Sequence, residues 1–288
     1  MTTVAEATGY RPTRTFSVWT EVRRQASRRR TQLALGFMVA LPLIVLAAFQ
    51  LDSGNDRNNR GGRGEFSSLV NVATSGGLNF ALVTVLFSAG FLLVVVFALF
   101  CGDTVASEAS WGSLRYLLAV PVPRGRLLGV KLVVALGYCL LAELLLVATA
   151  LAAGTARYGW HPLRSTIAAE IGSGPALLRL AAIIGYIAVS LLVVASLAFL
   201  LSVSTDAPLG AVGGAVLLNI LSSILDQITA LGSLRSFLPT HFANAWLGLL
   251  TTPLQTDDIV RGCVSSVAYA VLFFGLAWWR FLRKDIVS

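Results

Sequence analysis

Long uncharged apolar runs alternate with short polar segments along the whole chain. About 20 apolar residues are needed to cross roughly 30 Å of hydrocarbon as an α-helix, and six runs reach this length. Apolar residues occupy every face of these runs, which favours helices over the alternating strands of a membrane β-barrel. The predicted spans are residues 32–50, 79–101, 132–153, 180–203, 209–230 and 263–281. We therefore predict an all-α membrane protein with a six-helix transmembrane domain over residues 32–281.

The composition excludes a soluble protein. Of the 288 residues, 56% are hydrophobic and 12% are charged, and the mean hydropathy is +0.77. Average globular domains are about 45–50% apolar and about 25% charged. The three cysteines, Cys101, Cys139 and Cys263, lie inside apolar runs, so neither a disulfide framework nor a metal site is expected. The long charged leader before the first span, with no small-residue cleavage site after it, argues against a signal peptide.

The distribution of basic residues predicts the orientation of the spans. With six spans, both termini lie on one side, and that side holds 14 of the 22 Lys and Arg residues. Because positive charge concentrates on the cytoplasmic side, both termini are expected in the cytoplasm, including the short tail 282–288. The net charge of +8, made mostly from Arg, fits the cytoplasmic membrane of a bacterium with a GC-rich genome.

The cytoplasmic N-terminal segment 1–31 has an apolar stripe at helical spacing. Phe16, Trp19, Val22 and Ala26 share one face, and arginines occupy the others. This pattern is typical of an amphipathic helix that lies at the membrane surface. Arginines such as Arg23 and Arg24 would then meet anionic lipid headgroups.

A second apolar stripe lies in the segment between the fifth and sixth spans, on the predicted outer side. Phe242, Trp246, Leu249 and Leu250 are spaced for one helical face, which is too short to span a bilayer. The stripe predicts either a re-entrant extracellular hairpin packed against other helices or a surface anchor. The sequence leaves both readings open.

The stretch between the second and third spans combines charge with a helical face. Asp103, Glu108 and Arg115 are charged, Trp111 and nearby leucines share one face, and prolines end the pattern at 121 and 123. A charged helix of this kind, presented to the cytosol, is suited to docking a soluble partner. It could equally anchor its Trp111 face to the bilayer.

This stretch resembles the permease subunits of ABC type-2 exporters. The matching residues are Asp103, Glu108, the run Gly112–Arg115, Pro121 or Pro123, and Lys131. The resemblance extends to six spans, an N-terminal interfacial helix and an extracellular hairpin. It implies two permease chains, identical or homologous, above two separate ATPase subunits. The residues 102–120 would form a coupling helix, in which Asp103, Glu108, Trp111 and Arg115 touch or orient the ATPase, with Arg23 and Arg24 as further ATPase or lipid contacts.

The chain carries no ATP-binding motif of its own. A Walker A loop needs Gly directly before its Lys, whereas Lys131 and Lys284 follow Val130 and Arg283. The chain is therefore not expected to be an enzyme or to hold a cofactor, and ATP and Mg²⁺ would be bound by the partner ATPase. Its expected partners are that ATPase, a second permease chain and membrane lipids, and no nucleic acid.

Four polar residues are predicted near the middle of the bilayer. Glu143 lies roughly 18 Å along its helix from Lys131, and Ser88, Ser190 and Asn219 fall at similar depth. An ionised carboxylate at this depth is costly, so Glu143 should be protonated or face polar groups. These residues either line a substrate path or form hydrogen bonds between helices. Asp226 lies nearer the outer end, where water would solvate it.

The function expected from these features is the permease subunit of an ATP-driven exporter. The sparse polar belt among Leu, Val, Phe and Ala suits a hydrophobic or amphipathic cargo such as a drug, lipid or peptide-like molecule. The alternative is a proton-coupled secondary transporter that uses Glu143, although internal repeats typical of such folds are weak here. An intramembrane enzyme is not expected, because the sequence lacks G-x-S-x-G and H-E-x-x-H motifs.

Overall fold

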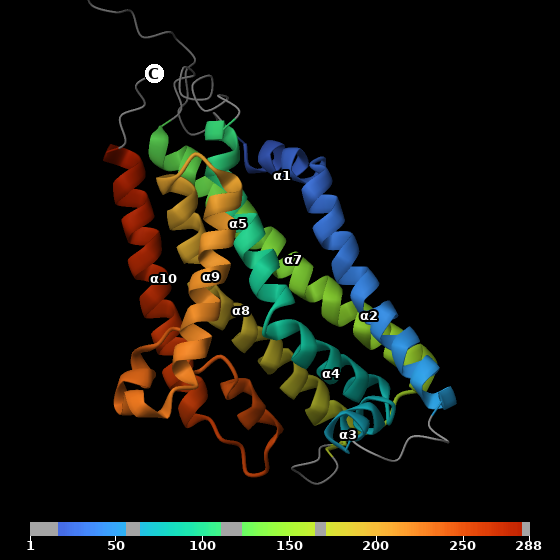
Figure 1. Ribbon diagram of the computed structural model, residues 1–288. Coiled ribbons are helices and arrows are strands. Elements are labelled where there is room, and N and C mark those ends of the chain that lie inside the picture. Colours follow the sequence, from blue (N-terminus) through green and yellow to red (C-terminus); the bar gives the residue numbers. More distant parts are fainter. Residues whose placement is uncertain (1–16, 56–63, 111–122, 165–170, 284–288) are drawn as a thin grey trace, which may run out of the picture.

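The chain forms an all-helical bundle in a computed structural model (Figure 1), which describes residues 17–55, 64–110, 123–164 and 171–283. Six described helices are long and apolar enough to cross a membrane. They are α2 (Arg29–Asn55), α5 (Leu92–Ser110), α7 (Arg124–Tyr158), α8 (Ser173–Ser204), α9 (Pro208–Asp226) and α10 (Asp257–Arg283). The predicted fold class and number of spans are thus confirmed.

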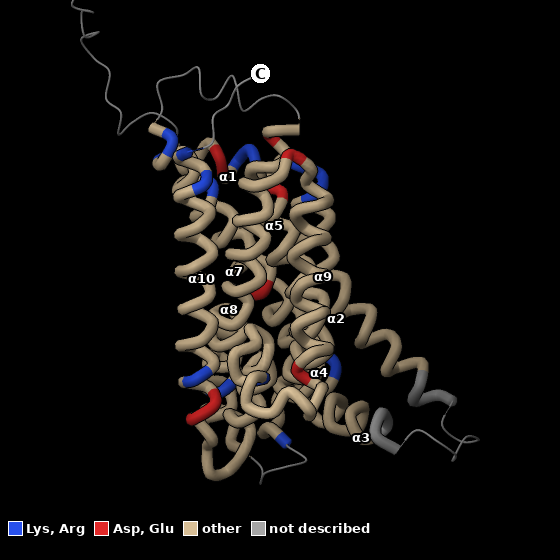
Figure 2. Tube along the Cα trace, turned by 60° about the vertical axis from the view of Figure 1, so that its left-hand side comes forward, with Lys and Arg blue, Asp and Glu red and all other residues tan. Residues whose placement is uncertain are grey.

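Charged residues gather at the two ends of the bundle, and the middle is almost entirely uncharged (Figure 2). The first described helix, α1 (Val18–Ala26), and the C-terminal end of the last, α10, lie at the same end of the bundle (Figure 1). This arrangement suits a protein whose ends face water and whose middle faces lipid. It also fits an even number of crossings.

The second predicted span is not one continuous helix. It is divided into α4 (Gly77–Ala89) and α5, which meet at an angle around Gly90 and Phe91 (Figure 1). Glycine has a low helix propensity, which makes Gly90 a favourable place for the interruption. A short helix α3 (Gly64–Ala73) precedes α4. The prediction of a single continuous span over 79–101 is therefore wrong. Of the two helices, α5 is the one long and apolar enough to cross a membrane.

Helix α5 lies at the centre of the bundle. It packs against α7, α8 and α9, and α4 packs against α7. Most of α5 is buried, whereas α2, α9 and α10 leave long apolar faces exposed. These exposed faces fit a lipid environment, because apolar side chains gain nothing from withdrawal out of hydrocarbon.

The close approach of α4 and α7 requires glycine. A Cβ built on Gly154 of α7 would lie 2.9 Å from Cβ of Phe80 and 3.1 Å from Cα of Gly77, both on α4. The ring of Phe80 also packs edge-on against Phe49 of α2, with centroids 6.2 Å apart. The helices α2, α4 and α7 thus form one closely packed group at the end opposite α1.

The segment between α9 and α10 folds into two short 3₁₀ helices, η2 (Thr229–Phe237) and η3 (Ala245–Leu250). Trp246 of η3 is fully buried in the core, and Arg179 of α8 donates a hydrogen bond to the carbonyl of Leu249 at 3.0 Å. The helical stripe predicted from Phe242 to Leu250 is only partly formed, because Phe242 lies in the turns before η3. The predicted re-entrant hairpin is not confirmed, because the described residues of this segment form two short 3₁₀ helices.

Candidate functional site

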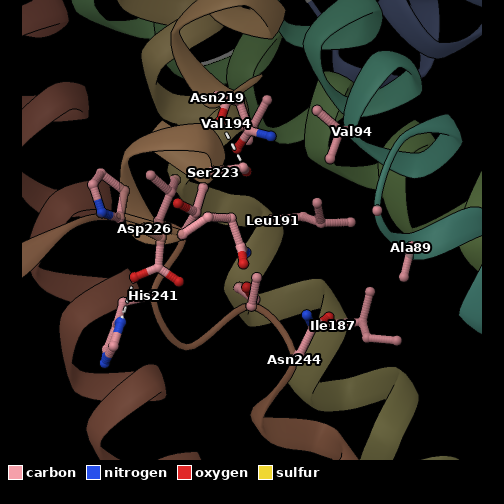
Figure 3. A pocket seen from close by; sticks show the side chains of 17 residues that line it. Ala89, Val94, Ile187, Leu191, Val194, Asn219, Ser223, Asp226, His241 and Asn244 are labelled. Atoms are coloured by element: carbon pink, nitrogen blue, oxygen red, sulfur yellow. Dashed lines mark hydrogen bonds and ion pairs between the residues drawn. The ribbon is translucent and has the colours of Figure 1, made fainter. Parts of the chain in front are cut away.

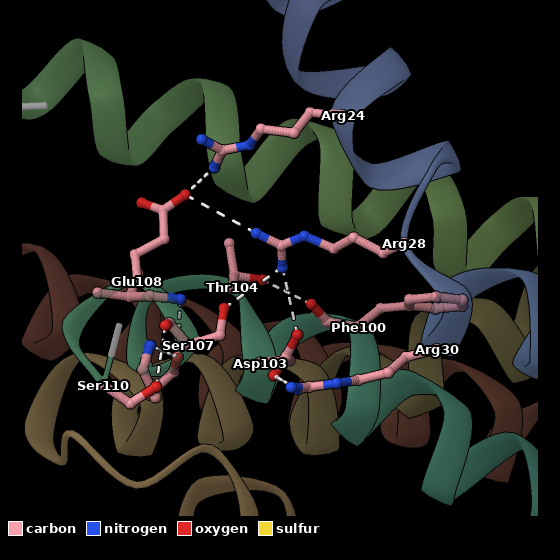
Figure 4. A network of polar contacts seen from close by, with 12 residues as sticks. Arg24, Arg28, Arg30, Phe100, Asp103, Thr104, Ser107, Glu108 and Ser110 are labelled. Atoms are coloured by element: carbon pink, nitrogen blue, oxygen red, sulfur yellow. Dashed lines mark hydrogen bonds and ion pairs between the residues drawn. The ribbon is translucent and has the colours of Figure 1, made fainter. Parts of the chain in front are cut away.

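A network of buried ion pairs joins four helices at the end of the bundle that holds α1. Glu108, near the end of α5, lies 2.6 Å from Nζ of Lys131 on α7 and pairs with Arg24 of α1. Lys131 also lies 3.2 Å from Glu21 of α1. A lysine and two glutamates, all at most about 5% exposed, therefore hold α1 against α5 and α7. Figure 4 shows Arg24 directed at the carboxylate of Glu108.

The second part of the network joins α5 to the start of α2. Arg28 lies 3.3 Å from Oδ2 of Asp103 and donates a hydrogen bond to the hydroxyl of Ser107 at 3.3 Å. Arg30 pairs with the other oxygen of Asp103 (Figure 4). The hydroxyl of Tyr138 on α7 donates to the carbonyl of Val22 on α1 at 2.8 Å. The four helices α1, α2, α5 and α7 are thus joined by polar contacts at this end.

The electrostatics of Glu21 follow from this setting. Burial would raise the pKa of its carboxyl group, but the positive charges of Lys131 and Arg24 outweigh burial and lower the pKa below its ordinary value. Glu21 is therefore ionised at neutral pH. Removing one member of such a buried network leaves the others uncompensated, which typically costs about 3–5 kcal/mol.

An open cleft of about 570 Å³ borders the network. Its lining is basic on balance and consists of Arg24, Arg28, Arg29, Arg30, Asp103, Ser107 and Glu108. Bases outnumber acids here by four to two. Acidic groups of a partner would be favoured at this cleft.

The predicted coupling-helix residues lie differently from expectation. Asp103 and Glu108 form the last turns of α5 rather than an exposed helix, and both are buried, with 5% and 3% exposure. The expectation that their side chains are exposed is wrong, because Arg24, Arg28 and Arg30 cover them. Trp111 and Arg115 lie outside the described residues, and so does most of the predicted coupling helix. On α1, Arg24 enters the network and Arg23 is exposed.

The four residues predicted near the bilayer centre separate into three environments. The hydroxyl of Ser88 is buried and donates to the carbonyl of Thr84 within its own helix at 2.7 Å. Glu143 is 1% exposed, and neither carboxylate oxygen has a hydrogen-bond partner among the described residues. Ser190 of α8 and Asn219 of α9 line one cavity. The predicted belt is therefore discontinuous, and two of its members share a site.

That cavity has a volume of about 270 Å³ and lies between α5, α8, α9 and the segment 239–244. One wall is polar and the other apolar (Figure 3). On the polar side, Oδ1 of Asp226 lies 2.5 Å from Nδ1 of His241. Val94, Ile187 and Leu191 belong to the apolar side. Ala89 and Gly90, where α4 ends, complete the wall.

Sequence reasoning missed the partners in both places. Arg28 and Arg30 counted only as orientation charges, and Lys131 entered only as part of the family resemblance, not as the partner of Glu21 and Glu108. The pairing of Asp226 with His241 depends on how residues 238–244 fold back over α9, where the hydroxyls of Ser222 and Thr240 are 2.7 Å apart. A pattern within a single helix does not carry that information.

Comparison with known families places the chain. A family model described as a protein of unknown function (DUF2705) matches residues 43–287. The chain belongs to this family. The match includes Asp103, Glu108, Lys131 and the whole cavity. Helix α1 with Arg24, and Arg28 after it, precede the matched region. No curated protein matches the chain.

Proposed function

We propose that this chain is the membrane-spanning permease subunit of an ATP-driven ABC exporter. In this proposal it pairs with a second permease chain in a bacterial cytoplasmic membrane and is driven by two separate ATPase subunits. The observation that carries the proposal is the buried ion network of Glu21, Arg24, Glu108 and Lys131, which fastens a surface-type helix to two spanning helices. A partner that moves α1 therefore moves α5 and α7.

Helix α5 supplies a direct mechanical route from the network to the cavity. Glu108 lies near one end of α5, and Val94, near the other end, lines the cavity. The two residues are 14 positions apart, which corresponds to about 21 Å along an α-helix. The hydroxyl of Ser202 on α8 also accepts hydrogen bonds from the backbone amides of Val105 and Ala106 at 3.0 and 2.9 Å. Movement at the network would thus reach both α5 and α8, which form two walls of the cavity.

The basic cleft offers a docking place for the ATPase. Arg29 and Arg30 are exposed at its rim, beside the network. We propose that this end faces the cytoplasm, as the distribution of positive charge predicts. The contact of Trp111 and Arg115 with the ATPase stays a prediction from the sequence, because both residues lie outside the described ranges. The partly apolar cavity supports a hydrophobic or amphipathic cargo.

Affinity purification with mass spectrometry tests the partnership first. The full-length chain should co-purify with a soluble ATPase and with a second permease chain. Vesicles that hold the complex should export cargo only with ATP.

In the reconstituted complex, Glu108→Gln should lower cargo-stimulated ATP hydrolysis at least fivefold, because the ion pairs with Arg24 and Lys131 are lost. Arg261→Gln is the control, because Arg261 is 71% exposed and lies outside the ion network. Cargo movement by the chain alone, without an ATPase, would contradict the proposal.

A second candidate function is a proton-coupled transporter that uses Glu143. The supporting observation is that both carboxylate oxygens of this buried residue have no hydrogen-bond partner in the described part of the chain. A carboxyl group in such a place marks proton pathways in membrane transporters. Transport that a protonophore abolishes, that ignores ATP and that Glu143→Gln eliminates would favour this function over the exporter.

A further inference from the structure

The polar wall of the cavity between α5, α8 and α9 is rich in uncommitted hydrogen-bond acceptors. Asp226 uses Oδ1 for His241, and Oδ2 has no partner among the described residues. The side chains of Ser190, Asn219 and Asn244 also form no hydrogen bond within the described ranges. Figure 3 shows Asp226, Asn219 and Ser223 on the same side of the cavity, opposite Val94 and Ala89. A ligand could therefore be held at Oδ2 of Asp226 without breaking any existing contact.

The charge of the site favours a cationic ligand. Among the described residues that line the cavity, none is Lys or Arg, and Asp226 is the acid. Arg235 is nearby, but it donates to the backbone carbonyl of Asp226 at 3.1 Å and not to the carboxylate. Helix α9 also ends at Asp226, so the negative end of its dipole adds to the carboxylate charge. At the opposite wall, the negative dipole end of α4 and the positive dipole end of α5 lie close together, so their charges offset each other.

The apolar wall determines the chemistry of the part of the ligand that lies beyond its charged group. Val94, Ile187, Leu191 and Val194 face the polar groups across the cavity. A volume of about 270 Å³ lies just below the range of 300–1,000 Å³ typical of pockets that enclose drug-sized ligands. The cavity therefore accommodates a polar head with a few carbons, while a longer hydrocarbon tail would extend out of it. A buried ammonium group needs a carboxylate partner, and Asp226 provides one.

We propose that this cavity binds the protonated amine head of an amphipathic organic cation. The ammonium group binds Oδ2 of Asp226 and the amide oxygens of Asn219 and Asn244, and the adjoining carbons pack on Val94 and Leu191. His241 contacts Oδ1 of the same carboxylate and draws on its negative charge, which weakens the binding of the ammonium group at Oδ2. That such a cation is the exported cargo rests on the proposed function, whereas its binding to the isolated chain does not.

Binding is tested with three probes that share one hydrocarbon chain: octylamine, octanol and octanoate. The full-length chain is placed in lipid nanodiscs, and the saturable binding of each radiolabelled probe is measured by equilibrium dialysis against empty nanodiscs. We expect saturable binding of octylamine, at least tenfold tighter than that of octanol, and no saturable binding of octanoate. Comparable binding of octanoate and octylamine to the unmodified protein would overturn the proposal, and this result requires no variant.

Variants locate the site. Asp226→Asn should weaken octylamine binding at least tenfold, and His241→Gln should strengthen it about threefold, because the competing contact is lost. Asp258→Asn is the matched control, since Asp258 is an exposed acid in the first turn of α10 and lies outside the cavity. Unchanged binding in a folded Asp226→Asn variant would refute the assignment. Failure to find an ATPase partner, with octylamine binding intact, would refute only the proposed exporter.

Discussion

Lys131 of α7 and Glu108 of α5 form an ion pair of 2.6 Å in which both side chains are almost completely buried. Arg24 and Glu21 of α1 complete the same group. The pair therefore connects the central helix α5 and its neighbour α7 with the surface helix α1. Its removal should affect both folding and the attachment of α1.

Lys131→Met should lower the stability of the protein by about 3–5 kcal/mol, because Glu21 and Glu108 lose a buried counter-charge. Thermal unfolding in detergent should show a clearly lower melting temperature. Arg261→Met is the control, since Arg261 is 71% exposed and its pair with Asp258 spans 4.0 Å. An equal, small effect of both substitutions would show that the ion network contributes little to stability.

The contribution of Glu21 should depend on pH. Its pKa in the folded protein lies below the ordinary value, mainly because Lys131 and Arg24 outweigh the effect of burial. The stabilisation is therefore fully present above the unfolded pKa of about 4.3 and is lost as pH falls through the lower folded pKa. The difference in melting temperature between the unmodified protein and Glu21→Gln should be large at pH 7 and should shrink below about pH 4. A difference that grows on acidification would contradict the assigned partners.

Gly154→Ala should destabilise the packing of α4 on α7 by about 1–3 kcal/mol, because the added methyl group overlaps Phe80. Gly137→Ala in the same helix should be neutral or stabilising by up to about 1 kcal/mol, since its Cβ would meet nothing within 4 Å. Urea or SDS titration of the two variants in matched micelles gives the comparison. The reverse order of stabilities would disprove the close contact between α4 and α7.

The proposed orientation predicts which ends react with a membrane-impermeant maleimide. In a chain whose three cysteines are replaced, Thr256→Cys should react in intact cells, and Ser27→Cys should react only in inside-out vesicles. Both positions are exposed, and they lie at opposite ends of the bundle. The opposite labelling pattern would place the basic end outside the cell.

The sequence predicted the bundle better than it predicted the site. Length and apolarity alone identify six spans, because lipid requires complete internal hydrogen bonding of the backbone. The interruption at Gly90 was missed, since one glycine within an apolar run is compatible with a continuous helix. The predicted depth along each helix placed Ser190 and Asn219 at the same level, and both line one cavity. Depth does not tell which way a side chain faces around its helix, so Ser88 was grouped with them although its hydroxyl bonds within its own helix.

The prediction that Asp103 and Glu108 are exposed was wrong for a different reason. Charged residues after an apolar run are solvated unless another segment supplies opposite charge. Here Arg24 and Arg28 come from residues about 80 positions earlier, a long-range pairing that composition does not reveal. The Asp226–His241 pair likewise depends on a loop that folds back on α9.

The interruption between α4 and α5 has a mechanical consequence. Helix α4 belongs with α2 and α7, whereas α5 packs chiefly against α8 and α9. The joint at Gly90 lies on the cavity wall itself. A molecule that binds in the cavity can therefore change the angle between α4 and α5 at this joint. Such binding would move the group α2, α4 and α7 relative to α5, α8 and α9, while each helix stays intact.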